Sequence, residues 1–271
     1  MTHIREKAWT WGYVIPKSVE GPGDVPYVGV ATQTGKSWCS LETAASYLGT
    51  PNVIFKNSMH DKNTLTDEYI EPIASSDKII CSLPFTALAE TAKRVSALSL
   101  KHTNITGAII DDFLEFHSAQ KTIPPDTTRA VYEALRSENQ SLRLYVVRYT
   151  WQDHTELLPH LPYFDVINLW VWVANLYDWQ VKMNEFEIDK LKRLTGKPVV
   201  LGLFVHDYGR TDGPVPMDIL ELQFKTAVRL TDSGVIEGFF VLQSGWFDKE
   251  DHRLQAQWIK QYFDWLFNTR R

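Results

Sequence analysis

The feature that most constrains the fold is a regular alternation of short apolar runs with longer amphipathic stretches. Eight runs are rich in β-branched or aromatic residues, at residues 10–15, 52–56, 78–82, 107–111, 142–148, 166–172, 198–205 and 237–243. Several have no polar face, as in the sequence VVLGLFV at 199–205. Strands that are apolar on both faces are typical of parallel sheets covered by helices. The alternation therefore predicts eight βα units.

The stretches between these runs have the spacing of apolar residues expected of helices. They cover residues 41–48, 85–98, 127–138, 177–194, 217–231 and 249–267. Ser40 is a suitable N-cap for the first of them, and Gly196 followed by Pro198 is a typical helix stop. The length of 271 residues is near the roughly 250 typical of a closed barrel. We predict an α/β fold, a single (β/α)8 TIM barrel over residues 1–271, with a doubly wound sheet as the structural alternative.

Composition excludes several classes of partner. The net charge is −5 and the basic residues are scattered, so we expect no nucleic-acid or membrane partner. No apolar run approaches the roughly 18 residues of a membrane span. Residues 1–16 lack a charged stretch followed by an apolar run, so no signal peptide is visible and we expect a cytoplasmic location. Cys39 and Cys81 form no metal or redox motif, and we expect two buried free thiols.

Active sites of such barrels are built at the C-terminal ends of the strands. Polar and aromatic residues at or just after the predicted strand ends are therefore the candidates. The candidate catalytic residues are Asp111, Asp112, Glu115, His206 and Asp207. The candidate substrate-binding residues are Trp11, Tyr13, Lys56, Asn57, His60, Arg148, Tyr149, Trp151, Trp172, Asn175, Tyr208, Gln243 and Trp246.

The sharpest candidate is the carboxylate pair Asp111 and Asp112, directly after the apolar end of the fourth run. Successive strand residues point to opposite faces, so one carboxylate should face the barrel mouth unless the chain curls there. Like charges held close together raise one pKa, and that carboxyl group then becomes a usable general acid. The structural alternative is that one aspartate caps the next helix or pairs with Arg148.

His206 and Asp207 directly follow the seventh run and form the second candidate group. A histidine beside an aspartate at a barrel mouth is suited to acid/base catalysis or to metal binding. The alternative is a histidine that is hydrogen-bonded into the following loop. Gly209 then allows a sharp turn.

Tryptophans form the third group. Of 10 in the chain, five lie at or near predicted strand ends, namely Trp11, Trp151, Trp170, Trp172 and Trp246. Flat apolar rings beside carboxylates and amides suit sugar rings, whose CH faces stack while their hydroxyls are hydrogen-bonded. We expect these rings to contribute to ligand affinity rather than to folding, with a position in the core as the alternative for Trp170.

The sequence GAIIDDF at 107–113 resembles the fourth strand of barrel glycoside hydrolases that use substrate-assisted catalysis, and the O-GlcNAc hydrolases are the nearest example. The resemblance implies that Asp111 orients and polarises an acetamido group of the substrate as nucleophile. It implies that Asp112 is the general acid/base.

The more familiar retaining glycosidases of this fold have one Glu on strand four and another on strand seven. This chain has His206 and Asp207 on strand seven, so we do not predict membership of that group. Glu115 or Asp207 would be the partner of Asp112, and the separation of the two carboxyl groups would distinguish retention from inversion.

We therefore predict an enzyme, a glycoside hydrolase with a carbohydrate substrate and no cofactor. A metal-dependent barrel hydrolase or isomerase is the first alternative, with His60, Asp112, His206 and Asp207 as possible ligands. The ligand types lack a recognisable spacing, so we predict no metal in the central site. A non-catalytic sugar-binding barrel is the second alternative.

Overall fold

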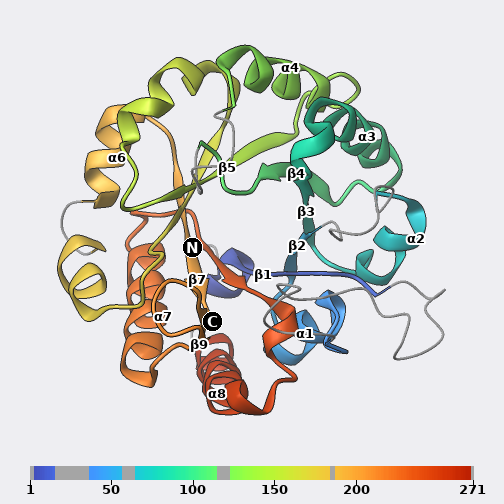
Figure 1. Ribbon diagram of the computed structural model, residues 1–271. Coiled ribbons are helices and arrows are strands. Elements are labelled where there is room, and N and C mark those ends of the chain that lie inside the picture. The colour runs from blue at the N-terminus through green and yellow to red at the C-terminus, as the bar shows by residue number, and fades with distance from the viewer. Residues whose placement is uncertain (1–2, 16–36, 57–64, 115–122, 184–186, 270–271) are drawn as a thin grey trace.

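Eight parallel strands close into a barrel in the computed structural model, which describes residues 3–15, 37–56, 65–114, 123–183 and 187–269 (Figure 1). Around the barrel the strands are β1 (Ala8–Gly12), β2 (Asn52–Phe55), β3 (Lys78–Leu83), β4 (Ile105–Ile110), β5 (Arg143–Tyr149), β6 (Val166–Trp170), β7 (Val199–Phe204) and β10 (Phe239–Leu242). The barrel closes where β10 pairs with β1 in parallel. This closure confirms the predicted (β/α)8 barrel and excludes the doubly wound sheet.

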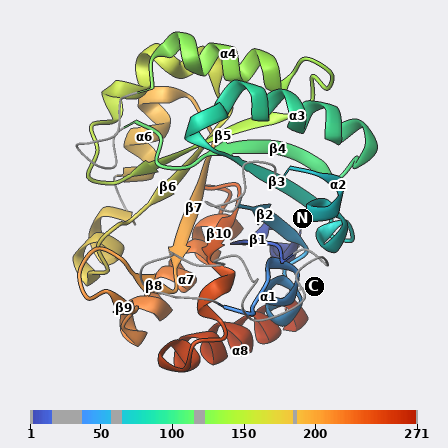
Figure 2. The same ribbon diagram turned by 45° about the vertical axis from the view of Figure 1, so that its right-hand side comes forward.

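Helices surround the strands (Figure 1). They are α1 (Leu41–Leu48), α2 (Asp67–Ile70), α3 (Leu88–Lys101), α4 (Pro125–Leu135), α6 (Glu187–Thr195), α7 (Met217–Asp232) and α8 (Arg253–Thr269). Ser40 caps α1 as predicted, because its side chain accepts a hydrogen bond from the backbone N–H of Thr43. The helices α1 and α8 lie side by side in both views, where the first and last βα units meet (Figure 2).

Two helical connections differ from the sequence prediction. The predicted helix 177–194 contains a π-helical segment, Asp178–Lys182, before α6 begins at Glu187. The connection between β5 and β6 is a 3-10 helix, His154–Tyr163, which the sequence analysis did not predict. It contains Pro159 and Pro162. Proline has no backbone N–H to donate, which disfavours a regular α-helix there.

Large aromatic side chains fill the barrel interior. Trp11 and Trp170 are both fully buried there and meet edge to face with ring centroids 6.0 Å apart. A Cβ atom at Gly202 would overlap the indole of Trp170, so a glycine at that position makes room for the ring. Trp11 therefore packs in the core, and we leave it out of the site proposed below.

Both cysteines of the chain are among the buried residues. Cys39 and Cys81 are free and buried, as predicted, and burial raises the pKa of both thiols to about 12. Among the residues described, no helix is long and apolar enough to cross a membrane.

Candidate active site

The carboxylate pair lies just beyond the end of β4, which stops at Ile110. Asp112 has a φ of 48°, in the left-handed region that non-glycine residues seldom adopt. The chain thus leaves the strand geometry here, and the strict alternation of faces no longer applies. Asp111 reaches Lys56 after β2, while Asp112 reaches Tyr149 at the end of β5. Both carboxylates are held at the rim of the barrel.

Asp111 is held by an ion pair. The Nζ atom of Lys56 lies 2.9 Å from Oδ2 of Asp111, and about a quarter of each side chain is exposed. Oδ1 of Asp111 accepts a hydrogen bond from the backbone N–H of Asp112 at 3.1 Å. Burial alone would lower the pKa of Lys56, but the carboxylate of Asp111 and the nearby Tyr13 raise it above its ordinary value. The lysine is therefore a stable cation beside the aspartate pair.

Asp112 has the electrostatics of a proton donor. Burial, with the adjacent charge of Asp111, raises its pKa from 3.8 to about 7. The Tyr149 hydroxyl donates a hydrogen bond of 2.6 Å to Oδ1 of Asp112, and this contact and Lys56 both act in the lowering direction. The pKa of Tyr149 lies well above its ordinary value, chiefly through burial, so this phenol keeps its proton. A carboxyl group with a pKa near neutrality can act as acid and then as base.

Five aromatic residues form an arc across the ends of the strands from β5 to β10, which we call the aromatic arc: Trp151, Tyr149, Trp172, Tyr208 and Trp246. Tyr149 stacks on Trp151 and meets Trp172 edge to face, with ring centroids 6.2 and 5.5 Å apart. Trp172 in turn stacks on Tyr208 at 5.7 Å. Trp151 is 55% exposed, whereas Trp246 is only 3% exposed. The arc thus has an open end at Trp151, close to Tyr149 and its partner Asp112.

The other end of the arc is a hydrogen-bonded cluster. Trp246 Nε1 and Gln243 Nε2 both donate to the hydroxyl oxygen of Tyr208, at 2.6 and 3.1 Å. Burial raises the pKa of Tyr208 to about 12, so the phenol retains a proton of its own. Tyr13, which is buried, is bound through its backbone to Ser244 and influences the pKa of both Lys56 and Tyr208. Tyr13 and Gln243 therefore belong to the same group as the arc.

Gly209 allows Trp172 to take its place in the arc. A Cβ atom at Gly209 would lie 2.7 Å from the carbonyl oxygen of Trp172 and 2.8 Å from its ring. These separations are shorter than van der Waals contact. The sequence analysis assigned Gly209 to a sharp turn, and the structure shows that it also permits this close approach.

Arg148 organises loops rather than the carboxylate pair. It is fully buried and donates to the carbonyl oxygens of Phe113 and Leu114 and to Glu156. These bonds tie the chain after β4 to the chain after β5. The alternative pairing of Arg148 with Asp111 or Asp112 does not form.

Asp207 and Asn175 also bind their own loops. The Asp207 carboxylate accepts hydrogen bonds from three successive backbone N–H groups, at Gly209, Arg210 and Thr211, and from the Thr211 hydroxyl. Asn175 Oδ1 accepts from the N–H of Asp178, which starts the π-helical segment. Because these local contacts occupy both side chains, we leave both residues out of the proposed site.

His206 lies behind the arc. It is 2% exposed, and its ring stacks directly on Trp246 with centroids 3.8 Å apart. Its ring nitrogens contact His252 and Asp212, two residues that the sequence analysis did not select as candidates. Its position beneath the arc favours a positioning role over direct catalysis. Glu115, Asn57 and His60 lie outside the described residues.

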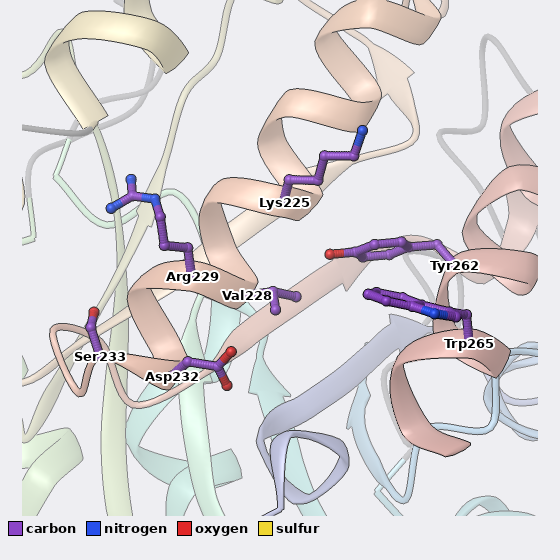
Figure 3. Close-up of a pocket in the computed structure, with 7 residues that line it drawn as sticks. All are labelled: Lys225, Val228, Arg229, Asp232, Ser233, Tyr262 and Trp265. Atoms are coloured by element: carbon purple, nitrogen blue, oxygen red, sulfur yellow. The ribbon is translucent and has the colours of Figure 1, made fainter. Parts of the chain in front are cut away.

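A hollow of about 570 Å³ lies between α7 and α8 (Figure 3). Tyr262 and Trp265 of α8 face Lys225 and Val228 of α7 across it. The hollow involves the C-terminal halves of both helices, which lie toward the opposite end of the barrel from the active face. Within the described ranges, no group of three or more His, Cys, Asp or Glu residues could hold a metal ion.

No protein-family model matches the chain, and no curated protein matches its sequence. Solved structures do match. A proposed alpha-L-fucosidase from Bacteroides thetaiotaomicron aligns with a TM-score of 0.60 at 11% identity, covering 99% of this chain and 95% of that one. A GH18 chitinase from Pseudoalteromonas aurantia aligns with a TM-score of 0.57 at 13% identity, covering 95% and 99%.

A GH128 endo-beta-1,3-glucanase from Amycolatopsis mediterranei, solved in complex with laminaritriose, aligns with a TM-score of 0.53 at 10% identity and covers 88% of each chain. Barrels of other function also match, among them a tryptophan synthase alpha-subunit from Pyrococcus furiosus. At these identities the similarity establishes the barrel fold that this chain shares with several glycoside hydrolases.

Proposed function

We propose that the chain is a glycoside hydrolase in which Asp112 is the general acid/base. The observation that carries the proposal is the environment of Asp112, whose pKa is raised to about 7 between Asp111 and Tyr149. A glycosidase needs a carboxylic acid that is still protonated near neutral pH, because the leaving oxygen must receive a proton. A structural aspartate would instead be expected to have its oxygens saturated by donors, as those of Asp207 are.

Asp112 would donate its proton to the glycosidic oxygen as the bond to the anomeric carbon breaks. Asp111, held by Lys56, would orient the substrate and offset the positive charge that develops on the sugar. In the substrate-assisted route, the oxygen of an acetamido group attacks the anomeric carbon while Asp111 accepts the hydrogen bond of its N–H. Asp112, now ionised, would then take a proton from the water that opens the ring intermediate. The same carboxyl group thus serves as acid and then as base.

The aromatic arc and its polar neighbours would supply sugar contacts. Indole and phenol rings stack on the CH faces of sugars, while Tyr208, Gln243 and Lys56 offer hydrogen-bonding groups for hydroxyls. Gln243 Oε1 is buried and has no hydrogen-bond partner among the described residues. The similarity to structures named as a fucosidase, a chitinase and a glucanase supports the choice of a carbohydrate substrate. Because one fold hosts many reactions, the residues of the site support the proposal more strongly than the fold does.

The test is hydrolysis of a panel of fucosides, N-acetylglucosaminides, chitin oligosaccharides and β-1,3-gluco-oligosaccharides by the purified protein. The combined variant Asp111→Asn with Asp112→Asn should abolish the hydrolysis found. Asp189→Asn is the matched control, since that aspartate lies on α6 with 62% of its side chain exposed. Binding without cleavage across the panel would support a sugar-binding barrel instead. Loss of turnover on chelation would support the metal-dependent alternative.

A further inference from the structure

Two histidines and two aspartates form a continuous hydrogen-bonded chain behind the aromatic arc. Asp251 Oδ1 lies 2.7 Å from His252 Nδ1, His252 Nε2 lies 3.0 Å from His206 Nδ1, and His206 Nε2 lies 3.1 Å from Asp212 Oδ1. The histidine side chains are at most 3% exposed, while those of the aspartates are at least 60% exposed. A buried imidazole pair is thus connected to solvent at both ends through a carboxylate.

The chain links three separate segments. His252 ends a short 3-10 helix, Glu250–His252, directly before α8. His206 lies in β8 (His206–Asp207), which pairs with β9 (Gly213–Pro214) in an antiparallel hairpin after β7. Asp212 lies in the turn of that hairpin with a φ of 48°, so its backbone conformation is an uncommon one.

Counting protons shows that the three contacts cannot all be hydrogen bonds when both histidines are neutral. Each contact needs one proton, whereas two neutral imidazoles carry two in total and ionised carboxylates carry none. If His252 donates to Asp251, its Nε2 must accept from His206 Nδ1. His206 Nε2 then presents a lone pair to the Asp212 carboxylate. The arrangement in the structure therefore needs a third proton.

We infer that the His206–His252 pair takes up one additional proton and that this proton closes the contact with Asp212. His252 is thereby a positioning residue for the end of the arc formed by Trp246 and Tyr208. The His206–Asp212 contact is the one that opens when the proton leaves, because its separation of 3.1 Å is longer than the 2.7 Å of the other histidine–aspartate contact, between His252 and Asp251.

The route from this proton to the arc is short. His206 stacks on Trp246 with an interplanar angle of 1°, and Trp246 donates to the Tyr208 hydroxyl. His206 also meets the ring of Tyr208 edge to face at 4.6 Å. Closing or opening the contact at Asp212 changes what holds the hairpin that carries both His206 and Tyr208. An imidazolium stacked on an indole is further stabilised by cation–π attraction.

Burial and the surrounding charges set the pH range in which the additional proton binds. Burial lowers the pKa of both His206 and His252. A neighbouring positive charge lowers each pKa further, that of His252 acting on His206 and that of Lys249 acting on His252. Asp212 and Asp207 act in the opposite direction on His206, as Asp251 does on His252. Because burial dominates, the additional proton should bind below the ordinary histidine pKa of 6.5.

The test is amide hydrogen exchange of residues 207–215 at about pH 5 and about pH 8, corrected for intrinsic exchange rates, together with nitrogen NMR of the imidazoles. In the parent protein the hairpin should be protected more at the lower pH, by on the order of tenfold. In Asp212→Asn, the amide supplies a donor to the bare His206 Nε2. That variant should therefore be equally protected at both pH values.

Asp212→Ala removes the partner altogether and should be weakly protected at both pH values, while Asp189→Asn should behave as the parent protein. The imidazole NMR should show His206 with a bare Nε2 at the higher pH. Equal protection of the parent protein at both pH values would overturn the inference. Protection that still depends on pH in Asp212→Ala would also overturn it, because a group other than the contact with Asp212 would then cause the pH dependence.

Discussion

The Tyr149 hydroxyl donates a 2.6 Å hydrogen bond to Oδ1 of Asp112, and this bond joins the end of β5 to the carboxylate pair that follows β4. It fixes the direction of a side chain whose backbone is in the left-handed region. It also opposes the rise in the pKa of Asp112 that burial and Asp111 produce. One contact therefore sets both the position and the protonation of the proposed acid.

Tyr149→Phe should move the pH dependence of turnover. Loss of the donor removes a stabilising contact of the ionised carboxylate, so the pKa of Asp112 should rise above about 7. If protonated Asp112 is the acid, the alkaline limb of kcat/KM should shift to higher pH by about one unit. The limb should not shift in Tyr47→Phe, whose hydroxyl contacts Ala256 on the outer face. If the alkaline limb stays in place in Tyr149→Phe, the hydroxyl of Tyr149 does not influence the pKa that limits turnover.

Replacement of tryptophans should distinguish packing from ligand binding. Trp11→Ala removes a fully buried ring and should cost ~3–5 kcal/mol of unfolding free energy. Trp151→Ala removes a ring that is 55% exposed and should change the unfolding free energy by less than ~1 kcal/mol, while weakening sugar binding. Denaturant unfolding and calorimetric sugar titration measure the two effects. A large stability loss in Trp151→Ala would assign that ring to packing.

Trp246→Ala should show both effects. The sequence analysis expected this ring to serve affinity rather than folding, but Trp246 is buried against His206 and bonded to Tyr208. We therefore expect a measurable loss of stability, larger than that of Trp151→Ala under the same unfolding conditions. A loss no greater than that of Trp151→Ala would restore the original expectation.

His154 should make the fold less stable in acid. Burial, with the charge of Arg148, lowers its pKa from 6.5 to about 4. Between these values the unfolded chain binds a proton that the native protein excludes, so stability falls as the pH falls. The residue should account for about 2 kcal/mol of lost stability between about pH 7.5 and about pH 5.

Urea unfolding of the parent protein and of His154→Leu across that range measures this contribution. The variant should lose less stability on acidification than the parent protein does. Asp112 acts in the opposite sense, because its raised pKa makes the native state bind a proton more readily below about pH 7. Identical pH slopes for the two proteins would exclude His154 as a source of acid lability.

The strands could be predicted well from the sequence because burial on both faces leaves long apolar runs. Their ends agree with the structure to within three residues, and the largest difference is at β1, predicted to reach residue 15 and observed to end at Gly12. The 3-10 helix His154–Tyr163 was missed because its prolines interrupt the apolar spacing that marks an α-helix.

The site could be predicted only in part. Strand ends identify which residues lie near the rim, and Asp111 and Asp112 do lie there. The rule does not give side-chain direction, so it could not show that Asp207 binds its own loop or that Trp11 faces the core. His252 and Asp251 could not be found at all, because they follow the last strand in a separate helical segment and meet His206 only in the fold.

The most direct test of the central claim compares Asp112→Asn and Asp111→Asn on glycosides with poor and with activated aryl leaving groups. If Asp112 is the acid, Asp112→Asn should lose roughly 10²-fold or more in turnover of the poor leaving group and much less with the activated one. Asp111→Asn should impair both classes similarly, since orientation and charge stabilisation are needed in either case. Asp112→Asn turning over the poor leaving group at the parent rate would contradict the assignment, as would an equal loss with both leaving groups.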